Sequence, residues 1–250
     1  MTVRRALVIG GTSEIALATI RRLRADGPIG ATLLGRNAEA LEQAAESLRD
    51  GGIEPVTVAH VEAADVAAHA AAVRQAFAGS GGGFDVVILA VGRLGAQAGL
   101  AADPAMTHEV LTTTFLGAGS LLLCALRELR AQGRGTAVVL SSVAAERPRA
   151  SNAVYGAAKA GLDALAQGLA DSLVGTGVNV LVVRPGFVAT KMTAGLKPAP
   201  FAASPEAVAN SIARALAGGR TGTIWVPGVL RYVFALLRHL PRPVFRRLPL

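Results

Sequence analysis

Short apolar segments alternate with longer Ala-rich segments along most of the chain. In the short segments Val, Ile and Leu follow one another almost without interruption, which is typical of strands covered on both faces. The repeated strand–helix order predicts an α/β fold of the Rossmann type, with a doubly wound, seven-stranded, mostly parallel sheet and helices on both faces. The predicted strands are 4–9, 30–34, 54–60, 85–90, 135–141, 178–183 and 222–226, and the predicted helices are 13–25, 37–50, 63–78, 105–131, 152–174 and 204–218.

The composition supports a packed domain and excludes several other classes. Hydrophobic residues make up 52% of the 250 residues and charged residues 17%, which excludes wholesale disorder. The single cysteine, Cys124, excludes an internal disulfide framework, and the four histidines lack the spacing of metal ligands, so we expect no metal site. We predict one folded domain over 1–228, followed by a basic amphipathic segment over 229–250.

The positive charge is concentrated near the C-terminus. The formal net charge is +8, and residues 229–250 contain five arginines and no acidic residue. Because the excess is local and aromatic residues are only 4%, we expect no nucleic-acid partner. The first apolar segment stops at Gly10-Gly11, too early for a signal peptide, and no run of 18 apolar residues occurs. We therefore expect neither a signal peptide nor a transmembrane helix, and a cytoplasmic protein.

A glycine-rich turn follows the first predicted strand and opens the first predicted helix. Small residues there let the backbone approach a pyrophosphate, which the amides and the dipole of the helix N-terminus would bind. Glu14 and Ala16 stand where a dinucleotide fold usually has glycine, so a plain tight turn remains an alternative. The residues predicted to bind a dinucleotide here are Gly10, Thr12, Ser13, Glu14 and Ile15.

Arg36 follows the second predicted strand, at the position that distinguishes the two nicotinamide dinucleotides. An acidic residue there would bind the ribose 2′-hydroxyl of NADH, but the chain has Gly35-Arg36-Asn37. The planar guanidinium matches the oxygens of a 2′-phosphate. We therefore expect NADPH to be accepted, with a solvated arginine at the start of the next helix as the alternative.

The most specific motif is Tyr155-Gly-Ala-Ala-Lys159, in a predicted helix. A spacing of four residues places both side chains on one helix face. The ammonium of Lys159 would favour the tyrosinate and lower the pKa of Tyr155, which would make the phenol a useful proton donor near neutral pH. Ser142 ends the fifth predicted strand, at the carboxyl edge of the sheet, where a hydroxyl can orient a carbonyl oxygen. We predict that Ser142, Tyr155 and Lys159 are the catalytic residues.

With the glycine-rich turn and the segment from Pro185-Gly186 to Thr190, these residues resemble the short-chain dehydrogenase/reductase family over about residues 3–227. The resemblance implies an NAD(P)-dependent oxidoreductase with NADH or NADPH as its cofactor. It implies that Tyr155 protonates a carbonyl oxygen, that Lys159 also holds the nicotinamide ribose, and that Thr190 helps to seat the carboxamide. The further cofactor-binding residues it implies are Gly92, Tyr155, Lys159, Pro185, Gly186, Val188 and Thr190.

The chain departs from the family pattern at three places. The Asn-Ala-Gly that usually follows the fourth strand is Ala90-Val91-Gly92 here. The helical Asn of the usual proton relay falls on Thr114 by spacing. The Asp that usually contacts adenine falls near His60, with Glu62 and Asp65 as neighbouring candidates. These departures put the relay and the adenine contacts in doubt.

Longer stretches are similar to family members that reduce a keto-sugar attached to a polyprenyl phosphate. The stretches are 10–15, 146–155, 184–192 and 231–250. This likeness implies a polyprenyl-phosphate sugar as substrate and a flavin-dependent oxidase as the partner that forms the ketone. Two alternatives remain open: a reductase of another lipid-like ketone, such as a ketoacyl or steroid compound, and a non-catalytic dinucleotide-binding scaffold.

The segment 229–250 suits a membrane-bound substrate, because a basic amphipathic helix can lie on an anionic membrane surface. The alternative is a segment that folds over the substrate pocket or into the interface of a homo-oligomer. Arg147 and Arg149, between Ser142 and Tyr155, can meet a substrate phosphate, with solvation at the surface as the alternative. The apolar face of the segment consists of Val229, Leu230, Val233, Phe234, Leu236, Leu237 and Leu240.

Overall fold

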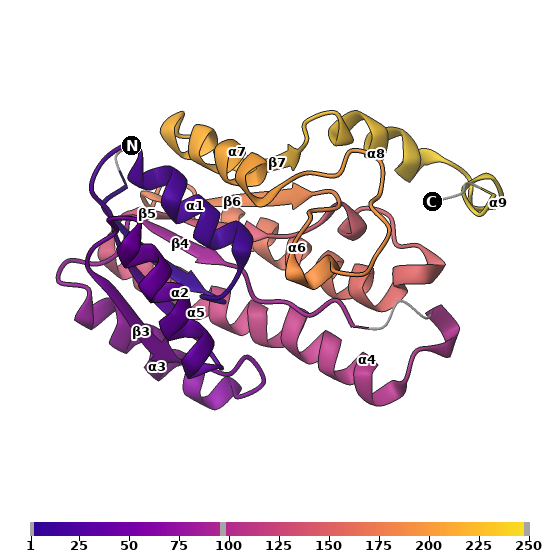
Figure 1. Cartoon of the computed structure of the whole chain (residues 1–250). Helices are drawn as coiled ribbons and strands as arrows, with labels where there is room; N and C mark the ends of the chain where they lie inside the picture. Colours follow the sequence, from indigo (N-terminus) through magenta and orange to yellow (C-terminus); the bar gives the residue numbers. More distant parts are fainter. Residues whose placement is uncertain (1–2, 96–98, 248–250) are drawn as a thin grey trace.

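A single parallel sheet of seven strands forms the centre of the computed structural model, which describes residues 3–95 and 99–247 (Figure 1). The strand order is β3-β2-β1-β4-β5-β6-β7, and every neighbouring pair is parallel. All seven predicted strands are present, so the predicted fold class is confirmed. Their bounds are β1 Arg5–Ile9, β2 Gly30–Gly35, β3 Val56–His60, β4 Val86–Leu89, β5 Gly135–Leu140, β6 Val178–Pro185 and β7 Gly222–Val226.

Helices connect the strands and cover both faces of the sheet (Figure 1). The predicted helix starts at Asn37 and Ser204 are confirmed, because their side chains accept hydrogen bonds from the amides of Ala40 and Ala207. The helices are α1 Glu14–Arg24, α2 Ala38–Asp50, α3 Val66–Gly79, α4 Pro104–Leu111, α5 Ala118–Gln132, α6 Ala153–Asp171, α7 Pro205–Ala217, α8 Leu230–His239 and α9 Arg242–Phe245, with short 3₁₀ turns at Gly99–Ala101, Val143–Ala145, Ala150–Asn152 and Lys191–Thr193.

Two apolar cores lie on opposite faces of the sheet. One contains buried side chains of α1, α2 and α7, such as Ile20, Leu48 and Ile212. The other contains buried side chains of α3, α5 and α6, such as Leu121 and Leu162. Burial on both faces explains why the strand sequences are continuously apolar rather than alternating.

The predicted helix over 105–131 is divided in the structure. A π-helical turn, Thr112–Gly117, separates α4 from α5, a feature that periodicity cannot distinguish from an ordinary helix.

The helical run Pro104–Gln132, which includes α4, this turn and α5, is long and apolar enough to cross a membrane by length and composition alone, but half of its most apolar window is buried inside the protein. Core helices pass the same test, so this run is weak evidence for a membrane span.

The C-terminal helix α8 packs against the body of the protein at the carboxyl edge of the sheet (Figure 1). Leu230 and Phe234 are buried and form a small apolar cluster with Val143, which follows the predicted catalytic Ser142. Part of the apolar face predicted for this segment is therefore directed toward the protein, which agrees better with a segment that folds over the domain than with a helix whose whole apolar face contacts a membrane. Tyr232 and Leu236 on the same helix remain exposed.

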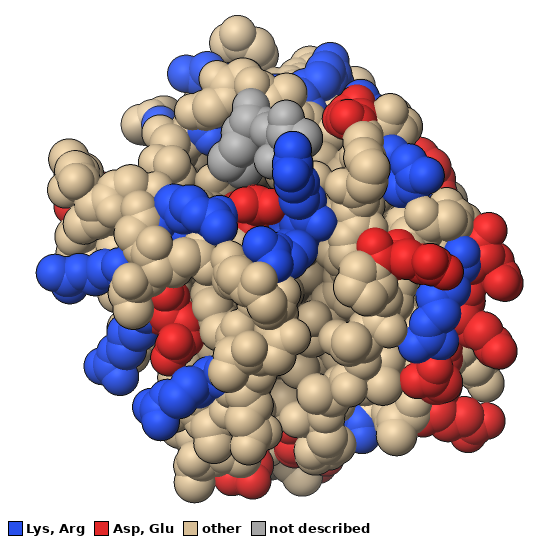
Figure 2. Space-filling view, turned by 90° about the vertical axis from the view of Figure 1, so that its left-hand side faces the viewer, with Lys and Arg blue, Asp and Glu red and all other residues tan. Residues whose placement is uncertain are grey.

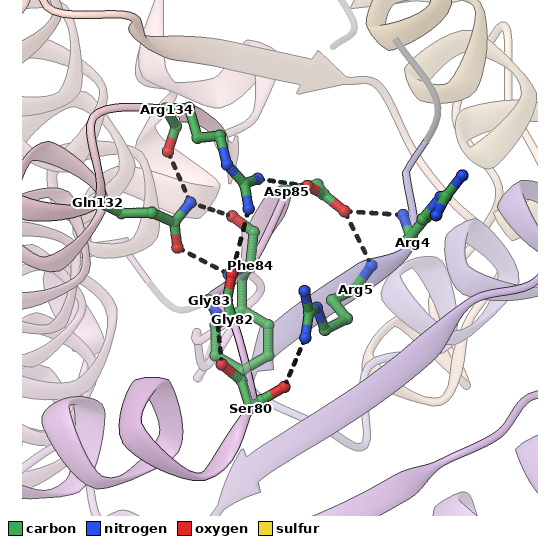
Figure 3. Close-up of polar contacts among 9 residues, drawn as sticks. All are labelled: Arg4, Arg5, Ser80, Gly82, Gly83, Phe84, Asp85, Gln132 and Arg134. Atoms are coloured by element: carbon green, nitrogen blue, oxygen red, sulfur yellow. Dashed lines mark hydrogen bonds and ion pairs between the residues drawn. The ribbon is translucent and has the colours of Figure 1, made fainter.

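The amino edge of the sheet is held by a polar cluster around Asp85 (Figure 3). The carboxylate of Asp85 accepts hydrogen bonds from the backbone amides of Arg4 and Arg5 and from the guanidinium of Arg134, at 2.8, 3.1 and 2.6 Å. The starts of β1, β4 and β5 are thereby joined, while their other ends face the opposite edge. Basic and acidic side chains are interspersed over this end of the molecule (Figure 2).

Candidate active site

A cavity of about 500 Å³ opens at the carboxyl edge of the sheet, where the strand order reverses between β1 and β4. In a doubly wound sheet this is the place where ligands bind. The thirteen residues predicted to bind the cofactor all line the cavity, and so does Ser142. The structure therefore brings together residues from the ends of five strands. The distances between these residues could not be read from any local sequence pattern.

The glycine-rich turn forms one wall of this cavity. Gly10 has a φ of 94°, and a Cβ there would lie 2.8 Å from the carbonyl carbon of Ala90, so a larger residue would not fit. The amides of Gly10 and Gly11 both donate to the carbonyl of Leu34, which fixes the turn after β1 against the end of β2. The N-terminus of α1 opens directly after it. A backbone cradle beside a helix N-terminus fits the pyrophosphate of a dinucleotide.

Glu14, which stands where the family usually has glycine, connects this turn to the segment after β6. Its carboxylate accepts a hydrogen bond from the backbone amide of Lys191 at 2.6 Å. In return, the ammonium of Lys191 donates to the carbonyl of Thr12 at 2.8 Å. This pair of bonds holds the segment from Thr190 across the cavity, and it gives Glu14 a structural role that the sequence analysis missed.

Tyr155 and Lys159 lie one helical turn apart on α6 and both face the cavity. The ammonium of Lys159 is buried, donates to the carbonyl of Leu140 at 2.7 Å, and lies 5.9 Å from the centroid of the Tyr155 ring. Ser142 is also buried, and its hydroxyl oxygen accepts a hydrogen bond from the amide of Ala144 at 3.1 Å. The hydroxyl proton of Ser142 is thus left available for a ligand or for Tyr155.

The pKa of Tyr155 differs in direction from the sequence-based expectation. Burial raises it to about 12, and the hydrogen bond with Ser142 opposes this shift without overcoming it. The expected lowering of this pKa is therefore wrong, because the loss of hydration on burial outweighs the hydrogen bond with Ser142. Burial also lowers the pKa of Lys159 to about 8, against the opposing effect of the Asp163 carboxylate. At neutral pH the phenol therefore keeps its proton, and Lys159 is mostly charged.

The chain is similar to known proteins in sequence and in structure. The sequence model described as "short chain dehydrogenase" matches residues 4–200. The chain belongs to the short-chain dehydrogenase/reductase family. It is 44% identical over 245 residues to an uncharacterized oxidoreductase of Mycobacterium tuberculosis, with 97% of this chain and 96% of that protein covered. It is 46% identical to an uncharacterized oxidoreductase of Streptomyces coelicolor, with 98% and 96% covered.

Solved structures of the family carry both nicotinamide dinucleotides. A 3-oxoacyl-[acyl-carrier protein] reductase from Brucella melitensis in complex with NAD superposes with a TM-score of 0.76 at 27% identity, covering 89% of this chain and 94% of that one. An actinorhodin polyketide ketoreductase with NADPH superposes with a TM-score of 0.79 at 24% identity, covering 90% of this chain and 96% of that one. At this identity the likeness shows a common fold and no more. The protein is an NAD(P)-dependent oxidoreductase of this family, and the residues of the cavity fit its cofactor.

Arg36 is exposed at the carboxyl end of β2 and lines the cavity. Within residues 3–95 and 99–247, no carboxylate forms a salt bridge with its guanidinium. This position suits a 2′-phosphate of NADPH, and Arg36 remains the predicted determinant of a preference for NADPH.

Of the candidates for an adenine contact, Glu62 lines the cavity, whereas His60 and Asp65 do not.

Thr114, at the position of the family's relay Asn, does not line the cavity. Its buried hydroxyl accepts from the amide of Arg93 at 2.9 Å and donates to the carbonyl of the same residue at 3.1 Å. A threonine has one hydroxyl proton, and this bond uses it. The side chain of Thr114 therefore has a structural role in the π-helical turn and supplies no proton to the site.

A buried carboxylate, Asp163, lies behind the predicted catalytic residues and was not found from the sequence. It lies one turn beyond Lys159 on α6 and accepts hydrogen bonds from Ser141 at 2.5 Å and from Gln167 at 2.6 Å. Arg184 of β6 binds both of its oxygens, at 2.9 and 2.7 Å. The bidentate pair joins α6 to the end of β6, and the hydrogen bond from Ser141 joins it to the end of β5. Together they fix the helix that carries Tyr155 and Lys159.

Arg147 and Arg149, the predicted substrate residues, lie outside this cavity and line a second one. The guanidinium of Arg147 donates to the carbonyls of Arg238 and Leu240, at 3.3 and 2.9 Å, at the end of α8. Its immediate partner is therefore the C-terminal segment. Arg149 is half-buried, and burial lowers its pKa from the usual value.

Proposed function

We propose that this enzyme reduces the 2-keto group of decaprenylphosphoryl-2-keto-erythro-pentofuranose to form decaprenylphosphoryl-arabinose, for the biosynthesis of cell-wall arabinan. The observation that carries the reductase assignment is the meeting of Ser142, Tyr155 and Lys159 in the same cavity as the glycine-rich turn. The substrate assignment is supported by the sequence stretches that lead into and follow these residues, and by the basic, partly apolar segment beside them.

The proposed roles of the residues follow from their protonation states. When bound, NADH or NADPH supplies the hydride that is added to the carbonyl carbon. Tyr155 donates its phenolic proton to the carbonyl oxygen, and Ser142 donates a hydrogen bond that orients the same oxygen. The ammonium of Lys159 stabilises the tyrosinate that remains and holds the nicotinamide ribose. The ketone thus gains one hydride and one proton and becomes an alcohol.

The proposed partners follow from the chemistry of the substrate. A flavin-dependent decaprenylphosphoryl-ribose oxidase would form the ketone, so that the two enzymes together invert one carbon. The lipid substrate is bound to a membrane, and we propose a peripheral location at the plasma membrane. Exposed Tyr232 and Leu236, near Arg231 and Arg238, support such a contact. We also propose that the protein forms a homo-oligomer. We propose no nucleic-acid partner.

A second candidate is the reduction of a ketoacyl compound. A relative named ketoacyl reductase HetN, from Nostoc, is 36% identical over 47% of this chain. The Brucella melitensis neighbour is named as a 3-oxoacyl-[acyl-carrier protein] reductase. Both names favour a ketone on an acyl group. This candidate shares the proton chemistry of Tyr155 with the first one and differs from it in the molecule that carries the ketone.

The test is a turnover assay with purified enzyme, NADPH or NADH, and the keto lipid, supplied directly or formed by the flavin oxidase. We expect arabinosyl lipid as the product and no comparable turnover of a 3-oxoacyl thioester. Tyr155→Phe should lower kcat by about 10²–10⁴-fold, because it removes the general acid. The matched control is Tyr232→Phe, at the other tyrosine of the chain, which is exposed.

Three outcomes separate the alternatives. Faster turnover of the 3-oxoacyl thioester would replace the first candidate by the second. An unchanged rate in Tyr155→Phe would place the chemistry elsewhere. Tight binding of NADPH without turnover of any ketone would indicate a dinucleotide-binding scaffold.

A further inference from the structure

A second cavity, of about 680 Å³, lies beside the loop that joins Ser142 to Tyr155. One wall is formed by residues 146–151 and 153, and the other by the C-terminal segment around α9. Four arginines line it: Arg147, Arg149, Arg242 and Arg246. We call it the arginine cavity. Figure 1 shows α9 at the same end of the molecule as the carboxyl edge of the sheet.

The arginine cavity has little negative charge of its own. Glu146 is its one acidic lining residue, and its carboxylate already accepts a hydrogen bond from the indole of Trp225 and lies 3.5 Å from the guanidinium of Arg184. Among the residues that the structure describes, no carboxylate pairs with Arg149, Arg242 or Arg246. The positive charges that meet here are therefore not neutralised by those residues.

Arg147 connects the two walls of the arginine cavity. Its hydrogen bonds to the carbonyls at the end of α8 fix the position of the chain that leads into α9. Its guanidinium also stacks on the ring of Phe245, 4.6 Å from the centroid. Arg147 therefore holds the C-terminal segment so that Arg242 and Arg246 face the same space as Arg149.

Arg149 is half-buried at the wall of the arginine cavity. Burial without a nearby opposite charge disfavours the charged form, in agreement with its lowered pKa. A guanidinium presents several N–H groups in a planar fork, which matches the oxygens of a phosphate. An anion of that shape would restore the interactions that Arg149 loses on burial.

Phe245 adds an apolar side chain to the lining of the arginine cavity. The ring of Phe245 lines the arginine cavity, and Val244, the residue before it, is exposed. A ligand that combines a phosphate with an apolar chain would therefore meet both kinds of surface. The same loop carries Ser142 and Val143 at its start and leads into Tyr155, so one loop connects the residues of the arginine cavity to those of the predicted reaction centre.

We propose that the arginine cavity is a phosphate-binding site that holds the phosphoryl group of an amphipathic substrate while its ketone reaches Ser142 and Tyr155. The assignment of the phosphate to the substrate rests on the proposed function. Arg149, Arg242 and Arg246 contact the phosphate oxygens, and Arg147 is a positioning residue that keeps α9 in place.

Binding is tested on the full-length protein with octyl phosphate, a soluble amphiphile that needs no turnover. We expect calorimetric binding, with octyl glucoside as the uncharged comparison. Arg149→Ala and, separately, Arg246→Ala should each weaken it at least tenfold. Arg130→Ala, at an exposed arginine of α5, is the matched control and should bind as the unaltered protein does. Equal affinity in all variants, or binding of octyl glucoside as tight as that of octyl phosphate, would overturn the proposal.

The source of the phosphate is tested by two further arms. Octyl phosphate should inhibit reduction of the keto lipid competitively, and Arg149→Ala should raise KM for this substrate more than it lowers kcat. If Arg149→Ala instead abolishes binding to phosphatidylglycerol vesicles while octyl phosphate does not inhibit, the ligand is a membrane headgroup and the substrate assignment is overturned. Octyl phosphate binding without any reduction of the keto lipid would refute the proposed function and leave the phosphate site standing.

Discussion

Burial of Lys159 should make the difference in stability between the cofactor-free enzyme and a variant without this charge depend on pH. The lowering of its pKa from 10.5 to about 8 corresponds to about 3 kcal/mol at pH 7. In Lys159→Met this cost disappears, while the carbonyl of Leu140 loses its hydrogen bond, which costs about 1–3 kcal/mol at every pH. The two effects nearly cancel at pH 7, so the pH dependence is the sharper observable.

The sign follows from proton binding in the two states. Between pH 8 and 10.5 the unfolded chain keeps a proton on this lysine that the folded protein has lost, so the free energy of unfolding rises with pH. From pH 7 to pH 9.5 the unaltered protein should gain about 2 kcal/mol relative to Lys159→Met. Above pH 10 ionisation of tyrosine in the unfolded chain acts in the opposite direction, because the pKa of Tyr155 is raised.

Urea unfolding of both proteins without cofactor, followed by circular dichroism at pH 7 and 9.5, measures this difference. The matched control is Lys197→Met, at an exposed lysine, which should change the free energy of unfolding by less than about 0.5 kcal/mol at either pH. A gap between Lys159→Met and the unaltered protein that stays constant over this range would refute the reasoning, since a pH-independent gap means that Lys159 is charged at both values.

Two other predictions concern the ion pair of Asp163 with Arg184 and the exposed Arg36. Asp163→Asn removes the charged bidentate partner of the partly buried Arg184, which keeps the Glu146 carboxylate at 3.5 Å, and should lower the free energy of unfolding by about 3 kcal/mol, measured in urea; a loss below about 1 kcal/mol would contradict the role of this pair. Arg36→Ala should raise KM for NADPH about tenfold, because it removes a charge-assisted contact to the 2′-phosphate, and should leave KM for NADH within about twofold. Steady-state kinetics with both cofactors measure this, and an equal effect on the two would exclude Arg36 from the role.

The fold could be predicted from the sequence because its signals are local. Each strand of the sheet is a continuous apolar run, and helix starts such as Asn37 and Ser204 are set by their own side chains and the next few amides. The cavity lining was also predictable, because the ends of parallel strands meet at one edge. The π-helical turn was not, since one additional residue in a helical turn leaves the apolar pattern of Pro104–Gln132 almost unchanged.

The electrostatics of the site could not be predicted in the same way. Spacing places Lys159 near Tyr155, but it does not give the burial that reverses the expected shift in the pKa of the phenol. The pair of Asp163 and Arg184 joins two residues 21 positions apart, and nothing in either local sequence indicates the other. The contact of Arg147 with the end of α8 spans 93 positions and is equally hidden from a sequence.

The succession of Tyr155, Lys159 and Asp163 on α6 limits how this protein can change over evolutionary time. A helix rotates by about 100° per residue, so inserting or deleting one residue between 155 and 163 would turn the proton donor, the ammonium and the anchoring carboxylate away from one another. Variation in this stretch is therefore confined to exchanges of one residue for another. Gains and losses of length belong in irregular segments such as 194–200, where no helical register has to be kept.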